Sequence, residues 1–185
     1  MSPRRKPPKP IIKGQICEIP LTRGLRALVD LHDLSCISQK IWSARFKRKT
    51  PYTQSATTID GKKSIIDMGR FILKLKHGDG RCVDHINGNP LDNRRVNLRI
   101  CSQRENRINR PKPIFKNPSS RFKGVWLDKR KNLKRRWMAG LKLNNKRIWI
   151  GRFETEIEAA KAYDKNAKRF FRKFAHLNFG GPNVH

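Results

Sequence analysis

Apolar and polar residues alternate along three runs in the last third of the chain, FKGVWLDKR (122–130), RRWMAGLKLN (135–144) and KRIWIGRF (146–153). Alternation of this kind is typical of half-buried strands, and the Lys/Asn-rich turns between the runs indicate an antiparallel meander. The face expected to be buried carries Val125, Leu127, Trp137, Ala139, Leu141, Ile148 and Ile150. The opposite face would display Lys123, Trp126, Arg136, Lys142, Arg147 and Trp149.

A helix is predicted directly after this meander. Thr155 is followed three residues later by Glu158, which is the spacing of a capping box at a helix start. Apolar residues then recur near helical spacing from Ile157 to Phe174, so one side of the helix is apolar. That side would cover the apolar face of the sheet. The pattern predicts a small domain over residues 121–180, made of a three-stranded antiparallel sheet packed on one helix, with a short tail at 181–185.

The stretch CVDHINGNPLDNRRVNLRICSQREN (82–106) reads differently. Its first four residues suit a strand, and two turn signals, Asn87-Gly88 and Asn89-Pro90, follow at once. Residues 98–100 suit a short return strand. Ser102 and Glu105 then form a second capping-box pattern.

We therefore expect a helix from near Gln103 to about Asn109, ending before Pro111. The local order is strand, loop, strand, helix.

The remaining sequence suggests how the chain is divided. Residues 16–80 hold short apolar runs between turn signals, which indicates a small mixed β/α segment with a helix around 65–75. The proline-rich residues 111–120 have the composition of a semi-rigid linker. Residues 1–15 are basic and proline-rich, and we expect a flexible arm there. The fold class is therefore α+β, with a domain at 16–110 whose strand–strand–helix core lies at about 81–110.

The charge balance points to the class of partner. The chain has 44 Lys and Arg against 14 Asp and Glu, a formal net charge of +30, which suits a polyanion and above all nucleic acid. A membrane surface is a weaker candidate because no run of about 18 apolar residues exists. An RNA-binding protein and a protein whose charge only confers solubility stay open as alternatives. The chain lacks an apolar leader-like segment, so we expect a cytoplasmic location in a bacterial or phage-infected cell, or an organelle, rather than secretion.

The four cysteines and five histidines are scattered, and no C-x-x-C pair occurs. We interpret the cysteines as reduced thiols, and a structural zinc site is not expected. Asp84 offers the hard oxygen that Mg²⁺ prefers, and His85 is a candidate general base. Asn106, in the first turns of the predicted helix, could point back at this pair. Such a set supports phosphodiester hydrolysis, with Arg94, Arg95 and Arg99 as candidate phosphate clamps. A lone Asp-His dipeptide, in contrast, is more often part of a simple turn.

The run D-H-I-N-G-N-P-L-D-N-R-R-V-N-L-R-I followed by Q-R-E-N closely resembles the HNH (ββα-metal) endonucleases, specifically the homing-type group of phages and introns. The resemblance implies that Asp84 and Asn106 bind one divalent metal, Mg²⁺ or Mn²⁺. It also implies that His85 is the general base and that Asn97 braces it, with Asn93 as the second choice for the brace. One departure is Met68-Gly69-Arg70, where these enzymes often read M-H-R.

Downstream, F-K-G-V, R-W-x-A, I-G-R-F-E-T-E-I-E-A-A-K-A-Y-D and L-N-F resemble the Apetala-two/ERF DNA-binding domain of plant factors. That domain reads the major groove of double-stranded DNA with the open face of its sheet. The resemblance implies DNA contacts from Lys123, Lys142, Arg147 and Trp149. Trp126 and Asp128 stand where the plant pattern has arginines, so the base preference of the plant factors is not transferred.

Together these features predict a site-specific, homing-type DNA endonuclease that uses one metal ion and a histidine base. With one such site per chain and a monomer favoured, we expect it to nick one strand per site. The products would carry 5′-phosphate and 3′-hydroxyl ends, as the family resemblance implies. The alternative is a non-catalytic, sequence-specific DNA-binding protein.

Overall fold

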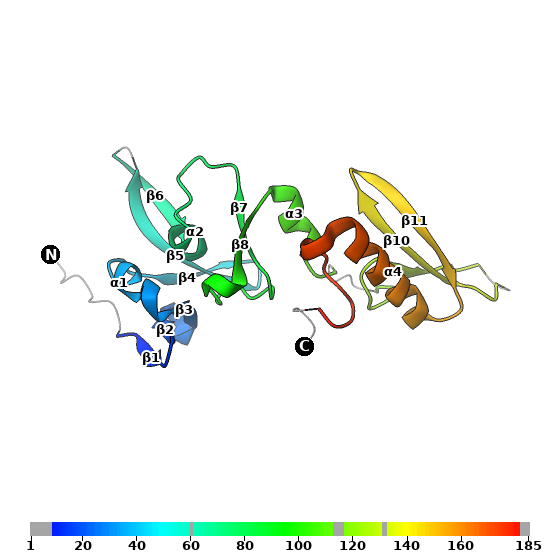
Figure 1. Ribbon diagram of the computed structural model, residues 1–185, viewed down its shortest axis with the longest axis horizontal. Helices are drawn as coiled ribbons and strands as arrows, with labels where there is room; N and C mark the ends of the chain where they lie inside the picture. The colour runs from blue at the N-terminus through cyan, green and yellow to red at the C-terminus, as the bar shows by residue number, and fades with distance from the viewer. Residues whose placement is uncertain (1–8, 60, 113–116, 131–132, 182–185) are drawn as a thin grey trace. The chain divides into compact units, whose positions relative to one another are not determined.

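The computed structural model describes residues 9–59, 61–112, 117–130 and 133–181 (Figure 1). Several small antiparallel sheets and a few helices make up these residues, which confirms the α+β class. The chain divides into two compact units, Met1–Gln103 and Arg104–His185. This division lies a few residues earlier than the predicted end of the first domain at residue 110. None of the helices among the described residues is long and apolar enough to cross a membrane.

The N-terminal unit begins with a three-stranded antiparallel sheet in the order β1-β2-β3. Its strands are β1 (Ile11–Lys13), β2 (Ile16–Pro20) and β3 (Arg26–Asp30), and the short helices η1 (Thr22–Gly24), η2 (Leu31–Asp33) and α1 (Leu34–Ile37) follow within and after it. Residues 11–13 were expected to belong to the flexible arm, but they pair with β2 instead. Residues 1–8 of the predicted arm lie outside the described residues.

A second antiparallel sheet follows in the order β4-β5-β6, and it leads into a short helix. These elements are β4 (Ser43–Lys47), β5 (Thr50–Ile59), β6 (Lys62–Asp67) and α2 (Met68–Ile72). The helix predicted around 65–75 therefore begins only at Met68. Ile65 and Ile66 lie in β6 and pair with Ala56 and Ser55 of β5, because β-branched side chains favour the strand.

One apolar core joins these elements of the N-terminal unit. Cys17, Val29, Ile37 and Met68 are fully buried in it, and Leu98 of a later strand packs into the same cluster. The core thus connects the first sheet, α1 and α2 to the segment that carries the candidate site. All four cysteines of the chain are free thiols.

The predicted order of strand, loop, strand and helix is observed after residue 81. β7 (Cys82–His85) pairs antiparallel with β8 (Leu98–Cys101), and the 3-10 turn η3 (Arg95–Asn97) lies in the loop between them. The helix α3 (Gln103–Ile108) begins at the predicted residue and ends before Pro111.

The C-terminal unit contains the predicted meander and helix. Its elements are β9 (Val125–Leu127), β10 (Trp137–Leu143), β11 (Lys146–Phe153), α4 (Glu156–Phe171) and η4 (Arg172–Phe174). The sheet has the order β11-β10-β9, and α4 lies along it (Figure 1). The capping box is confirmed, since Thr155 Oγ1 accepts from the Glu158 amide and Glu158 accepts from the Thr155 amide.

Small residues let α4 approach the sheet closely. Ala159, Ala160 and Ala167 of the helix are fully buried against the sheet, together with Val125, Ala139 and Leu141. Among the other residues expected on this face, Trp137, Ile148 and Ile150 are partly buried against the same clusters, and Leu127 is half-buried.

Gly124 shows how tight this packing is. Its φ is +72°, and a Cβ added there would lie 2.1 Å from the Tyr163 ring of α4, so no larger residue fits without displacing the helix.

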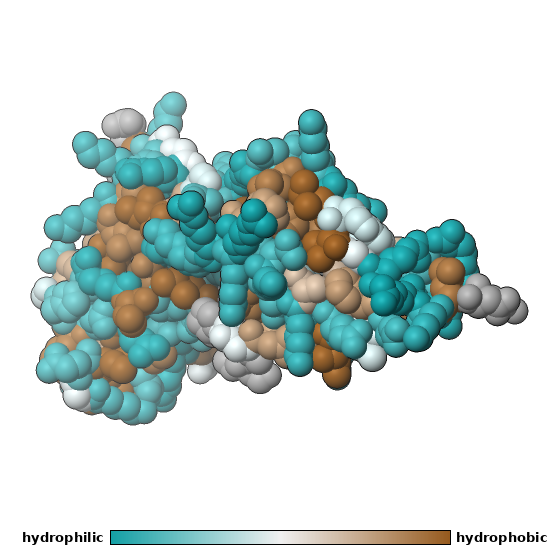
Figure 2. Space-filling view, turned by 45° about the vertical axis from the view of Figure 1, so that its right-hand side comes forward, coloured by the Kyte–Doolittle hydropathy of each residue, from teal (hydrophilic) through white to brown (hydrophobic). Residues whose placement is uncertain are grey.

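The molecular face drawn in Figure 2 is mostly hydrophilic, with hydrophobic patches between the polar side chains.

Candidate functional site

Asparagine side chains hold the loop between β7 and β8 in shape. Asn97, 6% exposed, accepts from the Asn87 amide through Oδ1 at 2.9 Å and donates through Nδ2 to the Asp92 carbonyl at 2.7 Å. The Asn87 side chain in turn donates to the Asp92 carboxylate at 2.9 Å. Side-chain amides thus satisfy backbone groups that no strand partner reaches. The Asn97 side chain thus holds the loop that connects His85, at the end of β7, to the start of β8.

The first sheet holds this loop in place through hydrogen bonds. Leu28 of β3 donates its amide to the Leu91 carbonyl, and the Asn93 amide donates to the Leu28 carbonyl, both at 2.8 Å. The Arg95 amide donates to the Asp30 carboxylate at 2.7 Å. The segment 16–80, to which the sequence assigned no role, therefore acts as the scaffold of the candidate site.

His85 is the last residue of β7, and its ring faces a buried asparagine. The His85 Nε2 atom lies 3.2 Å from Oδ1 of Asn93, which is 1% exposed. Because Oδ1 only accepts, this contact is a hydrogen bond when Nε2 carries the ring proton. The sequence ranked Asn97 first as the residue that orients His85, whereas the structure has Asn93 at the ring and Asn97 within the loop.

The surroundings of His85 favour its neutral form. Burial lowers the pKa of His85 below its ordinary value of 6.5, and this effect outweighs the Asn93 hydrogen bond and the nearby Asp84 charge, which both raise it. A histidine that is neutral at physiological pH can accept a proton. The electrostatics of this position therefore suit a general base.

The departure at Gly69 is explained by close packing in the same place. Gly69 is buried in α2, and a Cβ added there would lie 3.1 Å from Val83 Cγ1 and 3.4 Å from Asn93 Oδ1. A side chain at residue 69 would therefore crowd Val83 of β7, next to the asparagine that contacts His85. Arg70, the next residue, donates to the carbonyls of Lys76, Asp79 and Arg81 and so holds the turn that leads into β7.

Asp84 and Arg99 face each other across β7 and β8. The Arg99 guanidinium contacts Asp84 Oδ2 through Nε at 2.7 Å and through Nη2 at 2.6 Å, and the two side chains are 11% and 5% exposed. The candidate metal ligand is thus part of a largely buried ion pair. Asn106, the other candidate ligand, is half-buried on α3 and belongs to the C-terminal unit.

The two other arginines expected at phosphates also contact acidic residues of the N-terminal unit. Arg94 binds the buried Asp92 with Nε–Oδ1 and Nη2–Oδ2 distances of 2.7 and 2.6 Å. Arg95 binds the buried Asp33 in the same two-pronged way, at 2.9 and 2.8 Å. A phosphate-binding role for either residue stays a prediction.

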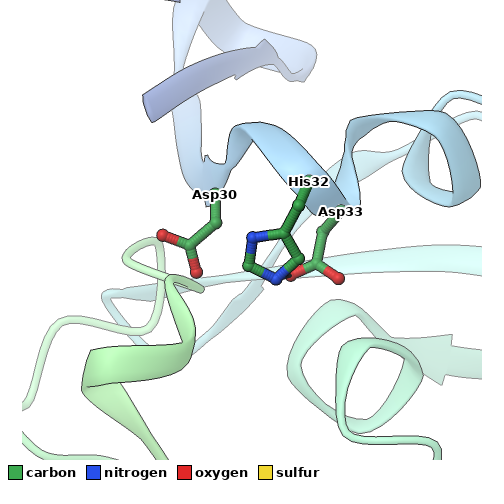
Figure 3. Close-up of side chains that lie close together, drawn as sticks. All are labelled: Asp30, His32 and Asp33. Carbon is green, nitrogen blue, oxygen red and sulfur yellow. Dashed lines mark ion pairs between the residues drawn. The ribbon is translucent and has the colours of Figure 1, made fainter. Parts of the chain in front are cut away.

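A trio of acidic and histidine side chains near β3 was not singled out by the sequence analysis. Asp30, His32 and Asp33 lie side by side, with potential ligand atoms within 4.8 Å of one another (Figure 3). Arg95 already binds both carboxylates, because its guanidinium contacts Asp33 and its backbone amide donates to Asp30. We therefore interpret the trio as the anchor of the β7–β8 loop. The only pattern in the sequence that could have indicated it is the run D-L-H-D at residues 30–33.

The open face of the C-terminal sheet carries a second candidate site. Trp126 and Trp149 contact each other with ring centroids 6.0 Å apart, and Arg147 lies over the Trp126 ring at 5.3 Å. The predicted face residues Arg136, Lys142, Arg147 and Trp149 are exposed, and Trp126 is half-buried. Cations and aromatic rings therefore share this face, as in surfaces that bind nucleic acid.

Lys123 differs from the other residues predicted on this face. Its ammonium donates to the carbonyls of Ile108 and Arg110, and burial lowers the pKa of Lys123 to about 8. Lys112 likewise donates to the carbonyls of Ser120 and Phe122, at 2.6 and 2.9 Å. The predicted DNA contact at Lys123 is untested, but its ammonium is engaged within the unit.

Arg152 is a candidate residue of this face that sequence reasoning missed. Its guanidinium lies 5.8 Å from the Trp149 ring centroid, and Nη1 contacts Asp128 at 2.6 Å. Arg130 also binds Asp128, and these contacts hold the pKa of the carboxyl well below its usual range. Strict alternation along β11 would put Arg152 and Trp149 on opposite faces of the sheet. The pairing with β10 shifts between Ala139 and Gly140, and this irregularity brings Arg152 to the same face as Trp149.

Comparisons with known proteins match two parts of the chain separately. A family model described as HNH endonuclease matches residues 70–108. APETALA2-like protein 2 of Oryza sativa subsp. indica is 46% identical over 67 residues, which are 35% of this chain and 14% of that protein. Dehydration-responsive element-binding protein 2D of Arabidopsis thaliana is 39% identical over 64 residues, 34% of this chain and 29% of that protein.

An AP2/ERF and B3 domain-containing transcription factor of Arabidopsis thaliana is 42% identical over 62 residues, 34% of this chain and 17% of that protein. This chain thus spans less than a third of the length of these relatives. No solved structure matches. Both resemblances noted in the sequence are supported in outline: one segment is similar to HNH endonucleases, and about a third of the chain is similar to plant APETALA2-type proteins.

Proposed function

We propose that this chain is a DNA endonuclease of the HNH homing type, with His85 as the general base. The observation that carries the proposal is the environment of His85, within the segment that matches the HNH endonuclease model. Burial keeps the imidazole neutral, and Asn93 fixes its ring at the end of β7. The imidazole of His85 would take a proton from the attacking water.

The proposal includes a divalent ion, Mg²⁺ or Mn²⁺, held by Asp84 and Asn106. A carboxylate and an amide oxygen are hard ligands and fit such an ion by their chemistry. When bound, the ion would supply Lewis-acid stabilisation of charge on the phosphate and the leaving oxygen. Because Arg99 contacts Oδ2 of Asp84, ion binding would compete with this ion pair. Asn97 supports His85 by holding the loop between the two strands.

The partner in this proposal is double-stranded DNA, bound by the open face of the C-terminal sheet. Support comes from the exposed Arg136, Lys142 and Arg147, from the net charge of +30, and from relatives whose names describe transcription factors and element-binding proteins. Phosphate contacts would position the sheet, and base edges would supply sequence preference. With one His85 per chain, a monomer would nick one strand per site and leave 5′-phosphate and 3′-hydroxyl ends.

A second candidate function is sequence-specific DNA binding without cleavage. The buried pair of Asp84 and Arg99 favours it, because this pair satisfies both charges without an ion. In this case the His85 region would have only a structural role.

Cleavage of supercoiled DNA from the genomic neighbourhood of the gene distinguishes the two functions. The full chain is incubated with Mg²⁺, with Mn²⁺ and with EDTA, beside His85→Ala and a control, His77→Ala, in which an exposed loop histidine is removed. We expect nicked product with either metal ion, none with EDTA, and a rate at least about 100-fold lower for His85→Ala.

DNA affinity, measured by gel shift, should be nearly the same for both variants. Cutting by His85→Ala at the wild-type rate would refute the role of His85. Tight binding without product in either metal ion would instead support the DNA-binding alternative.

A further inference from the structure

Two tryptophans bridge the middle strand on the open face of the C-terminal sheet. Trp126 comes from β9 and Trp149 from β11, the strands on either side of β10. Their rings meet at an interplanar angle of 65°, beside Gly140 of β10, which is the register partner of Trp149. The two indoles therefore form a continuous aromatic surface across the sheet.

Gly140 makes this arrangement possible. A Cβ added at Gly140 would lie 3.0 Å from Cη2 of Trp126 and 2.9 Å from the Ile148 carbonyl oxygen. Any side chain at residue 140 would push the Trp126 ring off the strand, because the carbonyl behind it cannot give way. The absence of a side chain thus lets the indole rest on the backbone of β10.

The cations of this face flank the aromatic surface. Arg147 stacks on Trp126, and Arg152 stacks on Trp149 while it binds Asp128. An arginine that reads guanine presents two N–H donors to the base edge, but the guanidinium of Arg152 is already engaged with a carboxylate. The face therefore offers apolar ring surface to a ligand, and the guanidinium groups of Arg147 and Arg152 lie over the rings.

A hollow of about 510 Å³ adjoins the Trp126 ring and is also lined by Gly140, Lys142 and Arg147. Trp149, next to Trp126, is 51% exposed. A large exposed aromatic surface is costly in water and marks a place where a partner binds. The only apolar group that a base pair presents in the major groove is the C5 methyl of thymine.

We propose that the Trp126–Trp149 pair recognises thymine methyl groups in the major groove, so that the target contains thymine where these rings bind. This inference rests on the proposed DNA-binding function and adds the kind of base that the sheet selects. Trp126 is the distinguishing residue, because it stands where the plant pattern has an arginine. It would contribute an apolar contact in place of a hydrogen bond to guanine.

The test compares thymine with uracil, which lacks only the C5 methyl group. Full-length His85→Ala protein selects binding sites from a random duplex pool, and each thymine of the selected site is then replaced by uracil in turn. We expect about fourfold weaker binding for each methyl contact that is lost, from a burial energy of about 0.8 kcal/mol per carbon. Positions outside the contact should bind equally well in both forms.

Variants assign the effect to the rings. Trp126→Ala should abolish the difference between thymine and uracil at the contacted position, whereas Trp126→Phe, which keeps an aromatic ring, should retain part of it. Lys142→Ala serves as the matched control, since it should weaken binding to both forms equally. Circular dichroism checks that each variant folds.

The outcomes separate the inference from the function on which it rests. If no duplex is enriched by the selection, the proposed DNA-binding function itself falls. If a site is enriched but has no thymine, or binds equally well with uracil at every position, the inference is overturned and the DNA-binding function stands. A thymine preference that is unchanged in Trp126→Ala also overturns the inference.

Discussion

The basic residues of the two candidate sites have different partners. In the N-terminal unit, Arg94, Arg95 and Arg99 each bind a buried aspartate through two guanidinium nitrogens. On the open face of the C-terminal sheet, Lys142 and Arg147 are exposed, whereas Arg152 binds Asp128. Paired arginines thus stabilise the fold in both units, and the exposed cations of the open face are available to a polyanion.

Buried carboxylates account for this difference. Asp33, Asp84 and Asp92 are at most 5% exposed, and a carboxylate removed from water needs a charged or hydrogen-bonded partner. In the C-terminal unit the buried Asp128 is likewise paired, with Arg130 and Arg152, whereas the buried Asp164 accepts from the amides of Asn178 and Phe179. An excess of arginine therefore indicates a DNA-binding surface only where the arginine side chains are not paired with buried carboxylates.

Removing Arg94 is the strongest test of this comparison. Arg94→Ala leaves the carboxylate of Asp92, 2% exposed, with only its Asn87 contact and the loop amides, so we expect a loss of about 3 kcal/mol in the free energy of unfolding. Lys142→Ala should change the same quantity by less than about 0.5 kcal/mol. Urea denaturation measures both; similar losses in the two variants would break the comparison.

The salt dependence of DNA binding should show the reverse order. Lys142→Ala should weaken binding about tenfold and lower the slope of log affinity against log salt by about 1, because one phosphate contact is lost. Arg94→Ala, if folded, should leave the slope unchanged, since its guanidinium is engaged with Asp92. Fluorescence anisotropy at several salt concentrations gives both slopes. A lower slope for Arg94→Ala would place this arginine at the phosphate backbone after all.

The cap of α4 tests the stability of the C-terminal unit alone. Thr155→Ala removes the acceptor for the Glu158 amide and should cost about 1 kcal/mol, whereas Thr155→Ser keeps a hydroxyl and should cost less. Hydrogen exchange can report the effect by unit, with faster exchange in α4 and unchanged exchange in β2 and β3. Equal changes in both units would show that they unfold together.

The pH dependence of cutting tests the site of the N-terminal unit. Burial lowers the pKa of His85, so the neutral base persists below pH 6.5, and the cutting rate should fall only at more acidic pH. Asn93→Asp places a negative charge beside the ring and should raise this pKa, because a nearby anion favours imidazolium. The acidic limb of the rate profile should then move to higher pH. An unmoved limb would exclude His85 as the titrating group.

Features with local causes were predictable from the sequence. The cap at Thr155, the three strands of the meander and the start of α3 at Gln103 each depend on residues a few positions apart. The helix predicted at 65–75 was placed too early, since its apolar spacing also fits a strand and the pairing of β6 with β5 decided the outcome. The pairing of the two strands, which depends on the tertiary fold, outweighed the local helical spacing here.

Features that depend on distant partners were not predictable. The ion pair of Arg95 gave no local signal, because its partner Asp33 lies 62 residues earlier in the chain. The choice between Asn93 and Asn97 at the His85 ring also required the loop, which β3 holds in place through Leu28. The metal ligands and the base remain predictions that rest on the family resemblance and on the chemistry of the residues.

The lysine contacts around the start of the C-terminal unit bear on how such units are exchanged between proteins. Lys123 and Lys112 tie the end of α3 and the following residues to the sheet domain through backbone carbonyls. A chimera joined at residue 120, where the composition suggests a boundary, would leave behind the Ile108 and Arg110 carbonyls and Lys112 itself. A graft that begins at Arg104 would preserve these contacts, and it would carry Asn106 along with the sheet. Recombination at residue 104 would therefore transfer a candidate metal ligand together with the target preference, whereas recombination at residue 120 would separate them.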